Sequence, residues 1–157
     1  MPGSPIDVQL APGEHFVGDA RHRVHTLLGS CVSITLWHPG RRIGAISHFL
    51  LAQRGASAPL LDARYGNEAL ALMVRDLALR GVEAADCEAH IFGGADMFPG
   101  NRSSLHVGRR NGETAHALLA QRGITVAGNC LYGHQHRRIL FDIASGEVRS
   151  LRPQVPA

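Results

Sequence analysis

The sequence contains no lysine: its 157 residues include 16 basic residues, and all of them are arginine. It also lacks any uninterrupted apolar run near the roughly 18 residues that a membrane-spanning helix needs. The first 16 residues, MPGSPIDVQLAPGEHF, have neither the basic segment nor the apolar segment of a secretory signal peptide. These absences predict a cytoplasmic protein that does not insert into a membrane.

The chain also has little excess charge, since its formal net charge at pH 7 is only +3. The arginines are scattered along the chain except for three adjacent pairs, and they do not alternate with aromatic residues as in a nucleic-acid-binding stripe. The composition therefore predicts no nucleic-acid partner.

Cysteines are few: Cys31, Cys87 and Cys130 are widely spaced and odd in number, which indicates reduced thiols and not a disulfide framework. Hydrophobic residues make up 45% of the chain and charged residues 18%, values typical of a packed globular protein. The length fits one domain over residues 1–157, with an ordered core at about 16–151 and short tails.

Hydrophobic periodicity and turn residues predict more strands than helices. Strands are expected at 32–36, 44–51, 88–92, 124–127, 138–142 and 147–151. Helices are expected at 67–80, capped by Asn67 and ended by Gly81, and at 111–122. The fold class predicted is α/β, a single layered domain with a mixed, largely antiparallel sheet and two main helices.

The Gly-Ser-Cys turn before the first of these strands is the most informative short segment. Cys31 could be a small core residue, a metal ligand or a nucleophile. As a nucleophile it needs a base, and His48, 17 residues later across a hairpin, is the best candidate. Thr26 or His25 could orient that histidine, and the thiol would then ionise below the roughly 8.5 of a free cysteine.

The backbone amides of Ser30 and Cys31 could hold a developing oxyanion, because a glycine turn exposes consecutive N–H groups. From the residues alone, however, the simpler interpretation of Cys31 is a small buried thiol, and of His48 a core histidine. Cys130, His134 and His136 offer ligand types that suit zinc, but their C-x3-H-x-H spacing lacks a second cysteine nearby. We therefore expect no metal there.

Several segments together resemble the chemoreceptor glutamine deamidase family, CheD. They are TLLGSCVSITLWHP, GAISHFLL, RYGNEALALMVRDLALRGV, IFGGADMF, VGRRN and ILFDIASGEV. The resemblance runs from about Phe16 to Leu151, and its most specific elements are the Gly-Ser-Cys turn, the histidine 17 residues later and the FGGA loop.

The resemblance implies an α/β sandwich shared with deamidating bacterial toxins and a catalytic set of cysteine, histidine and threonine. Carried over, Cys31 is the nucleophile and His48 the base. The family threonine stands six residues before the cysteine, where this chain has His25. Thr26 lies five before and belongs to the TLLGSC string, so we assign it the orienting role, with His25 as the alternative.

A second departure from the family pattern lies at AGNCLYGHQHRRILFD. Cys130 occupies the position of a frequent acidic residue, and Tyr132 and His136 occupy positions of glycines. The shape of this loop is therefore expected to differ from the family pattern.

The function that the resemblance implies is deamidation of receptor glutamines to glutamate through a cysteine thioester, without any cofactor, during chemotactic adaptation. The implied partners are methyl-accepting chemotaxis receptors, as substrates, and a regulatory chemotaxis phosphatase. Two alternatives stay open: a non-catalytic module that binds receptors or the phosphatase, and another cysteine amidase or peptidase.

Overall fold

The structure, a computed structural model, describes residues 3–56, 58–98, 100 and 102–151. Its strands are β1 (Ile6–Gln9), β2 (His15–Gly18), β3 (His22–Leu28), β4 (Val32–His38), β5 (Ile43–Ser47), β6 (Glu88–Gly93), β7 (Thr125–Leu131), β8 (Arg137–Asp142) and β9 (Val148–Leu151). Its helices are α1 (Gly66–Leu79), the short 3-10 helix η1 (Ala84–Asp86) and α2 (Arg102–Gln121).

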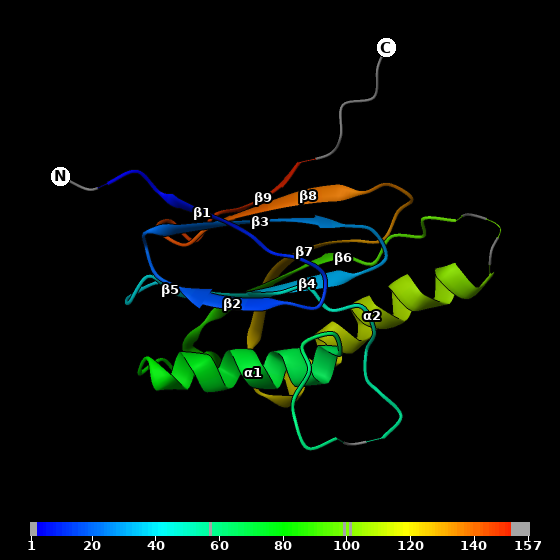
Figure 1. Ribbon diagram of the computed structural model, residues 1–157, viewed down its shortest axis with the longest axis horizontal. Coiled ribbons are helices and arrows are strands. Elements are labelled where there is room, and N and C mark those ends of the chain that lie inside the picture. The colour runs from blue at the N-terminus through cyan, green and yellow to red at the C-terminus, as the bar shows by residue number, and fades with distance from the viewer. Residues whose placement is uncertain (1–2, 57, 99, 101, 152–157) are drawn as a thin grey trace, which may run out of the picture.

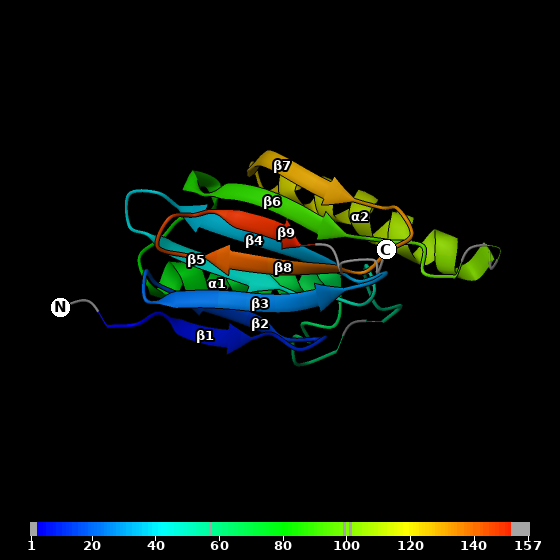
Figure 2. The same ribbon diagram turned by 90° about the horizontal axis from the view of Figure 1, so that it is seen from above.

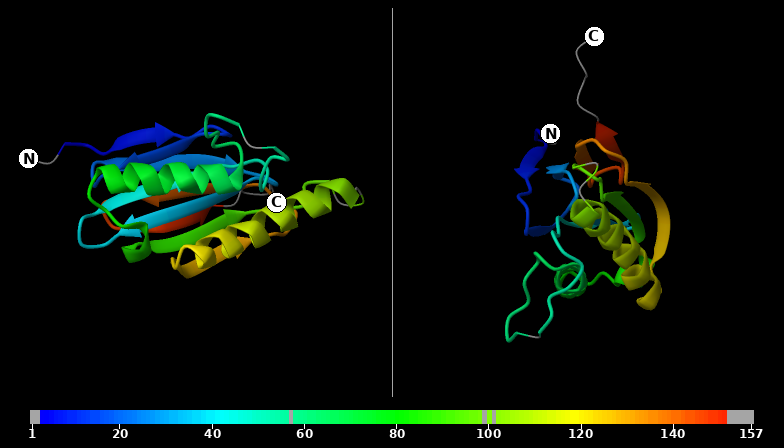
Figure 3. Two further views of the ribbon diagram at one scale, coloured as in Figure 1. Left: turned by 90° about the horizontal axis from the view of Figure 1, so that it is seen from below. Right: turned by 90° about the vertical axis from the view of Figure 1, so that its right-hand side faces the viewer.

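The strands form two stacked sheets (Figures 1 and 2). One has four strands in the order β1-β3-β8-β9, and the other has five in the order β2-β5-β4-β6-β7. Among the strand pairs of the described residues, only β1–β3 and β6–β7 are parallel. Both helices cover the outer face of the five-stranded sheet, which gives three layers (Figure 3). The predicted α/β sandwich with a mixed, largely antiparallel arrangement is confirmed.

Strand β4 shows how the layers form, because successive side chains of a strand point to opposite faces. Ile34 and Leu36 are fully buried in the cluster that includes Leu70 and Met73 of α1. Ile46, the partner of Thr35 on β5, belongs instead to a core that includes residues of the four-stranded sheet. The odd-numbered residues of β4 therefore face the space between the two sheets.

The predicted strands are present, and most differ only in their ends. The predicted strand 44–51 is shorter than expected: β5 ends at Ser47, and Phe49 and Leu51 form only isolated bridges. Leu50 and Leu51 turn away because both of their N–H groups bond to the carbonyl of Arg64. His48 thus lies just beyond the strand.

The predicted cap of the first helix is wrong. Helix α1 begins at Gly66 after Tyr65, and no side chain caps it. The N–H groups of Gly66 and Asn67 donate instead to the carbonyls of Leu51 and Ala52, which replace a side-chain cap. Gly81, with φ +76°, does follow the end of this helix as expected.

Helix α2 begins nine residues before the predicted start at Asn111. Its early turns contain Gly108, which suggests a loop from sequence but is required by packing here. A Cβ at Gly108 would lie 2.5 Å from the carbonyl oxygen of Gly94. The first half of α2 extends past the end of the sheets (Figures 1 and 3). No helix of the described residues is long and apolar enough to cross a membrane.

Candidate active site

Cys31 lies half-buried in the turn between β3 and β4, and backbone contacts fix this turn against the FGGA loop. The carbonyl of Cys31 accepts a hydrogen bond from Gly94 N at 2.9 Å, and that of Gly29 accepts one from Ala95 N at 3.0 Å. Gly93 has φ +111°, and a Cβ there would lie 2.1 Å from the Cys31 carbonyl oxygen. Only glycine allows this close approach.

Asn111 of α2 holds the same turn from the other side. Its side chain is 1% exposed, and Nδ2 donates to the carbonyls of Ser30 at 3.2 Å and of Leu50 at 2.8 Å. One amide group thereby connects the residue before Cys31 with the segment that follows His48. Asn111 lies in the VGRRN segment, but no local sequence pattern marks it as a residue of the site.

His48 is 1% exposed, and its ring bonds to the opposite sheet. Its Nδ1 lies 2.7 Å from Oγ1 of Thr26, which is 3% exposed on β3. The backbone of His48 is held as well, since its N–H donates to Glu14 O at 3.1 Å and its carbonyl accepts from Gly13 N at 2.8 Å. The ring therefore has one defined position between the sheets.

The hydrogen bonds of Thr26 determine the tautomer of His48. A threonine hydroxyl has one hydrogen, and Thr26 donates it to the carbonyl of Leu10 at 2.9 Å. The hydroxyl must then accept from His48, so Nδ1 of the neutral ring carries the proton. Nε2 keeps its lone pair, the arrangement that a general base requires.

His25 points away from this site. Its Nε2 lies 2.9 Å from Oδ1 of Asp7 on the neighbouring strand β1. Consecutive residues of a strand face opposite sides, so His25 and Thr26 cannot both reach His48. The geometry therefore favours Thr26 as the orienting residue.

Strand register places Cys31 and His48 on one face of the five-stranded sheet. Val32 bridges Phe49, and Thr35 pairs with Ile46 in the same register. This register puts Ser33 opposite His48 and makes Cys31 a diagonal neighbour, a separation that side chains can span. The structure records no hydrogen bond between the Cys31 thiol and the imidazole, both of which lie in its described part.

Both groups are neutral in this resting arrangement. Burial raises the pKa of the Cys31 thiol, and the hydrogen bond from its own backbone N–H lowers it only in part. Burial also lowers the pKa of His48 to about 4. The expectation that Cys31 ionises below a free thiol is wrong for this state, because desolvation outweighs any effect of the uncharged imidazole.

The backbone around Cys31 offers donors for an oxyanion. Within the described residues, the N–H groups of Ser30 and Cys31 donate to no backbone carbonyl. Both precede β4 and take no part in its ladder. At rest the Cys31 N–H bonds to its own sulfur, and both N–H groups can donate to a negatively charged oxygen formed beside the thiol.

The three candidate zinc ligands, Cys130, His134 and His136, contact different parts of the structure. Cys130 lies beside Arg137, whose guanidinium donates to its carbonyl and, at 3.4 Å, to its sulfur. His134 Nδ1 lies 3.2 Å from the carbonyl of Asp96, whereas the ring of His136 lies near Gly29. Across the described ranges, no three His, Cys, Asp or Glu residues are grouped so as to hold a metal ion.

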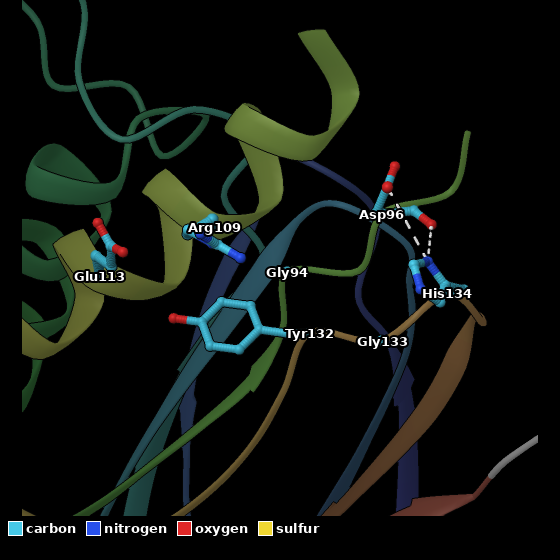
Figure 4. Close-up of a pocket in the computed structure, with 7 residues that line it drawn as sticks. All are labelled: Gly94, Asp96, Arg109, Glu113, Tyr132, Gly133 and His134. Atoms are coloured by element: carbon cyan, nitrogen blue, oxygen red, sulfur yellow. Dashed lines mark hydrogen bonds and ion pairs between the residues drawn. The ribbon is translucent and has the colours of Figure 1, made fainter. Parts of the chain in front are cut away.

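A cavity of about 400 Å³ lies beside the turn, between α2, the FGGA loop and the loop that follows β7 (Figure 4). Gly94, which bonds to Cys31, forms part of its wall, together with Arg109, Glu113 and Tyr132. Tyr132 has φ +72°, a left-handed backbone conformation that residues other than glycine rarely adopt. Its ring packs against Gly112, where a Cβ would lie 2.7 Å from the phenol oxygen.

A thiol, a neutral imidazole and a hydroxyl that orients it are the groups that cysteine-dependent acyl transfer requires. The family model for CheD chemotactic sensory transduction matches residues 50–152. The chain is 57% identical over 150 residues to the probable chemoreceptor glutamine deamidase CheD 2 of Albidiferax ferrireducens, covering 93% of this chain and 87% of the relative.

Two further relatives with the name probable chemoreceptor glutamine deamidase are similar over most of their length. CheD 1 of Chromobacterium violaceum is 41% identical, with 90% of this chain and 75% of the relative covered. CheD 3 of Dechloromonas aromatica is 39% identical, with 98% and 91% covered. The chain belongs to the CheD family. The family model begins after Thr26, Cys31 and His48, whereas the relatives align over nearly the whole chain.

The low pKa of His48 predicts a loss of stability in mild acid. Between pH 6.5 and about 4 the unfolded chain binds a proton at this residue and the folded protein does not. The free energy of unfolding should therefore have its full value above about pH 6.5. It should fall by up to about 3 kcal/mol as the pH falls to about 4. Urea unfolding at a series of pH values measures this change.

The matched variants are His48→Asn, which cannot take up the proton, and His134→Asn, which alters a side chain that is 66% exposed. The first should lose less stability over this pH range than the wild type, and the second should lose as much. Equal losses in all three proteins would contradict the assigned protonation of His48.

Proposed function

We propose that this protein is a glutamine deamidase that acts on chemoreceptors, with Cys31 as nucleophile, His48 as base and Thr26 as the residue that orients the base. The observation that carries the proposal is the buried Thr26–His48 hydrogen bond, which leaves Nε2 unprotonated on the face that Cys31 shares. Family membership and the names of the relatives supply the reaction and the substrate class.

In the first half of the reaction the Cys31 sulfur attacks the carboxamide carbon of a glutamine side chain. Both groups are neutral at rest, so the thiol proton moves to Nε2 of His48 as the carbon–sulfur bond forms. The amide oxygen becomes an oxyanion and accepts hydrogen bonds from the N–H groups of Ser30 and Cys31. His48 then protonates the amide nitrogen, the carbon–nitrogen bond breaks and ammonia leaves.

In the second half a water molecule attacks the thioester carbon and gives a proton to His48. The carbon–sulfur bond breaks, His48 returns the proton to the sulfur, and the products are a glutamate side chain and the free thiol. The hydroxyl of Thr26 accepts the Nδ1–H bond throughout and holds the ring in place. No step in this sequence calls for a cofactor.

The substrates that this proposal assigns are cytoplasmic helices of methyl-accepting chemotaxis receptors, so the protein works in the cytoplasm. A chemotaxis phosphatase is the regulatory partner that the family resemblance implies. The competing functions are a receptor-binding module without turnover and a cysteine peptidase. Intact-mass analysis of a receptor cytoplasmic fragment distinguishes all three: deamidation replaces NH2 by OH, binding leaves the mass unchanged, and a peptidase cleaves the chain.

Replacing the nucleophile should abolish turnover without unfolding the protein. Cys31→Ala is expected to lower the deamidation rate by about a thousandfold or more, because the covalent route is lost. Cys87→Ser and Cys130→Ser are the matched controls, since these free thiols lie outside the proposed catalytic set. If either control fell as far as Cys31→Ala, or if Cys31→Ala kept its activity, the assignment of the thiol would be wrong.

The two candidates for the orienting role should differ in effect. Thr26→Ala removes the partner of Nδ1 and is expected to lower kcat by about ten- to a hundredfold while the KM for the receptor fragment changes little. His25→Ala breaks only the contact with Asp7 and should leave kcat near the wild-type value. The reverse order of effects would show that His25 has the role.

A further inference from the structure

The buried hydroxyl of Ser33 forms no hydrogen bond in the described part of the resting site. The residue is fully buried, and its Oγ has no hydrogen-bond partner among the described residues. A buried hydroxyl without a partner has a free-energy cost, and such groups in native proteins call for an explanation. The neighbouring buried hydroxyl of Ser47 shows the usual arrangement, because it accepts from Ile34 N at 3.3 Å.

The strand register puts Ser33 directly opposite His48. Val32 and Phe49 exchange both backbone hydrogen bonds, at 3.1 and 2.9 Å. The next pair, Ser33 and His48, is therefore a pair without such bonds, in which Cα atoms approach to about 4.5 Å and side chains lie closest together. Accordingly, the backbone of His48 bonds to Gly13 and Glu14 on its other side.

The face on which this pair lies is the one that contains the proposed reacting groups. Alternation along β4 puts Ser33 on the same side as Cys31, opposite to Val32 and Ile34, which pack in the cluster with the helices. The hydroxyl of Thr26, from the four-stranded sheet, is already hydrogen-bonded to Nδ1 of His48. Nε2 is the ring atom left for Ser33.

The polar group that bonds to this ring is the hydroxyl of Thr26, and strand register places Ser33 and Cys31 on the same face as the ring. In the described part of the chain no charged side chain pairs with His48. A proton that moves from the thiol to the ring therefore creates an imidazolium and a thiolate in a buried space, where unsolvated charge is costly. A hydroxyl beside the ring can reduce this cost.

We propose that Ser33 is a positioning residue whose Oγ accepts a hydrogen bond from Nε2–H of His48 once the Cys31 proton has moved there. The step transfers one proton from sulfur to Nε2 and leaves a thiolate, and the hydroxyl of Ser33 keeps its own hydrogen. The hydroxyl thus has no partner at rest and gains one in the charged state. This inference rests on the proposed function for its use in catalysis, and on the geometry alone for its effect on the thiol.

Alkylation of Cys31 by iodoacetamide, followed at the peptide level across pH, tests this role without any receptor. Only the thiolate reacts, so the rate reports the charged pair. Ser33→Ala is expected to slow the alkylation of Cys31 by about tenfold near neutral pH and to shift its pH profile upward, because a hydrogen bond to a charged group is lost. Its unfolding midpoint in urea should be unchanged or higher, since the unpartnered hydroxyl is gone.

Ser47→Ala is the matched control: the same atom is removed from an equally buried serine whose hydroxyl has a partner. It should lower the unfolding midpoint and leave the alkylation profile of Cys31 unchanged. Wild-type alkylation of Cys31 in Ser33→Ala would overturn the proposal and reduce Ser33 to a packing residue. Failure of the proposed function would look different, since the receptor fragment would then keep its mass while the alkylation pattern persisted.

Discussion

The hydrogen bond between Thr26 and His48 joins the two sheets at the site and fixes the orientation of the imidazole. The threonine comes from the four-stranded sheet and the histidine follows a strand of the five-stranded sheet. The carbonyl of Leu10, just after β1, accepts the hydrogen bond of the threonine hydroxyl, so this hydroxyl can only accept from the ring. The parallel pairing of β1 with β3 thus determines which nitrogen of His48 keeps its lone pair.

Backbone contacts with the FGGA loop hold the Cys31 turn, whereas His48 is held by its own backbone and by the hydroxyl of Thr26. Gly93 lets the FGGA loop approach the turn, and Gly94 and Gly108 let α2 approach that loop, more closely than any side chain would allow. Asn111 then ties the turn to the segment after His48. This arrangement keeps the proposed nucleophile and base on one face of the sheet, and within the described residues the N–H groups of Ser30 and Cys31 donate to no backbone carbonyl.

The sequence predicted the fold class and most strands and offered Cys31 and His48 as candidate site residues, because a glycine turn, alternation and a family motif are local signals. It left Thr26 and His25 as alternatives because β3 was not assigned, and strand alternation is what separates them. The early start of α2 was missed since Gly108 normally disfavours a helix, and only its contact with Gly94 explains it. No local sequence pattern reveals the contacts of Asn111, Ser33 and the Leu10 carbonyl, because these contacts depend on packing and strand register. The direction of the Cys31 pKa depends on burial and was likewise predicted wrongly.

The hydrogen bonds of Thr26 imply that neutral His48 carries its proton on Nδ1 and leaves Nε2 free on the face shared with Cys31. Nitrogen-15 NMR of the imidazole rings in the resting protein, with His48 assigned by comparison with His48→Asn, measures the tautomer directly. We expect a protonated Nδ1 and an unprotonated Nε2 at neutral pH, and loss of this fixed preference in Thr26→Val. A wild-type spectrum in which Nε2 of His48 carries the proton would contradict this assignment.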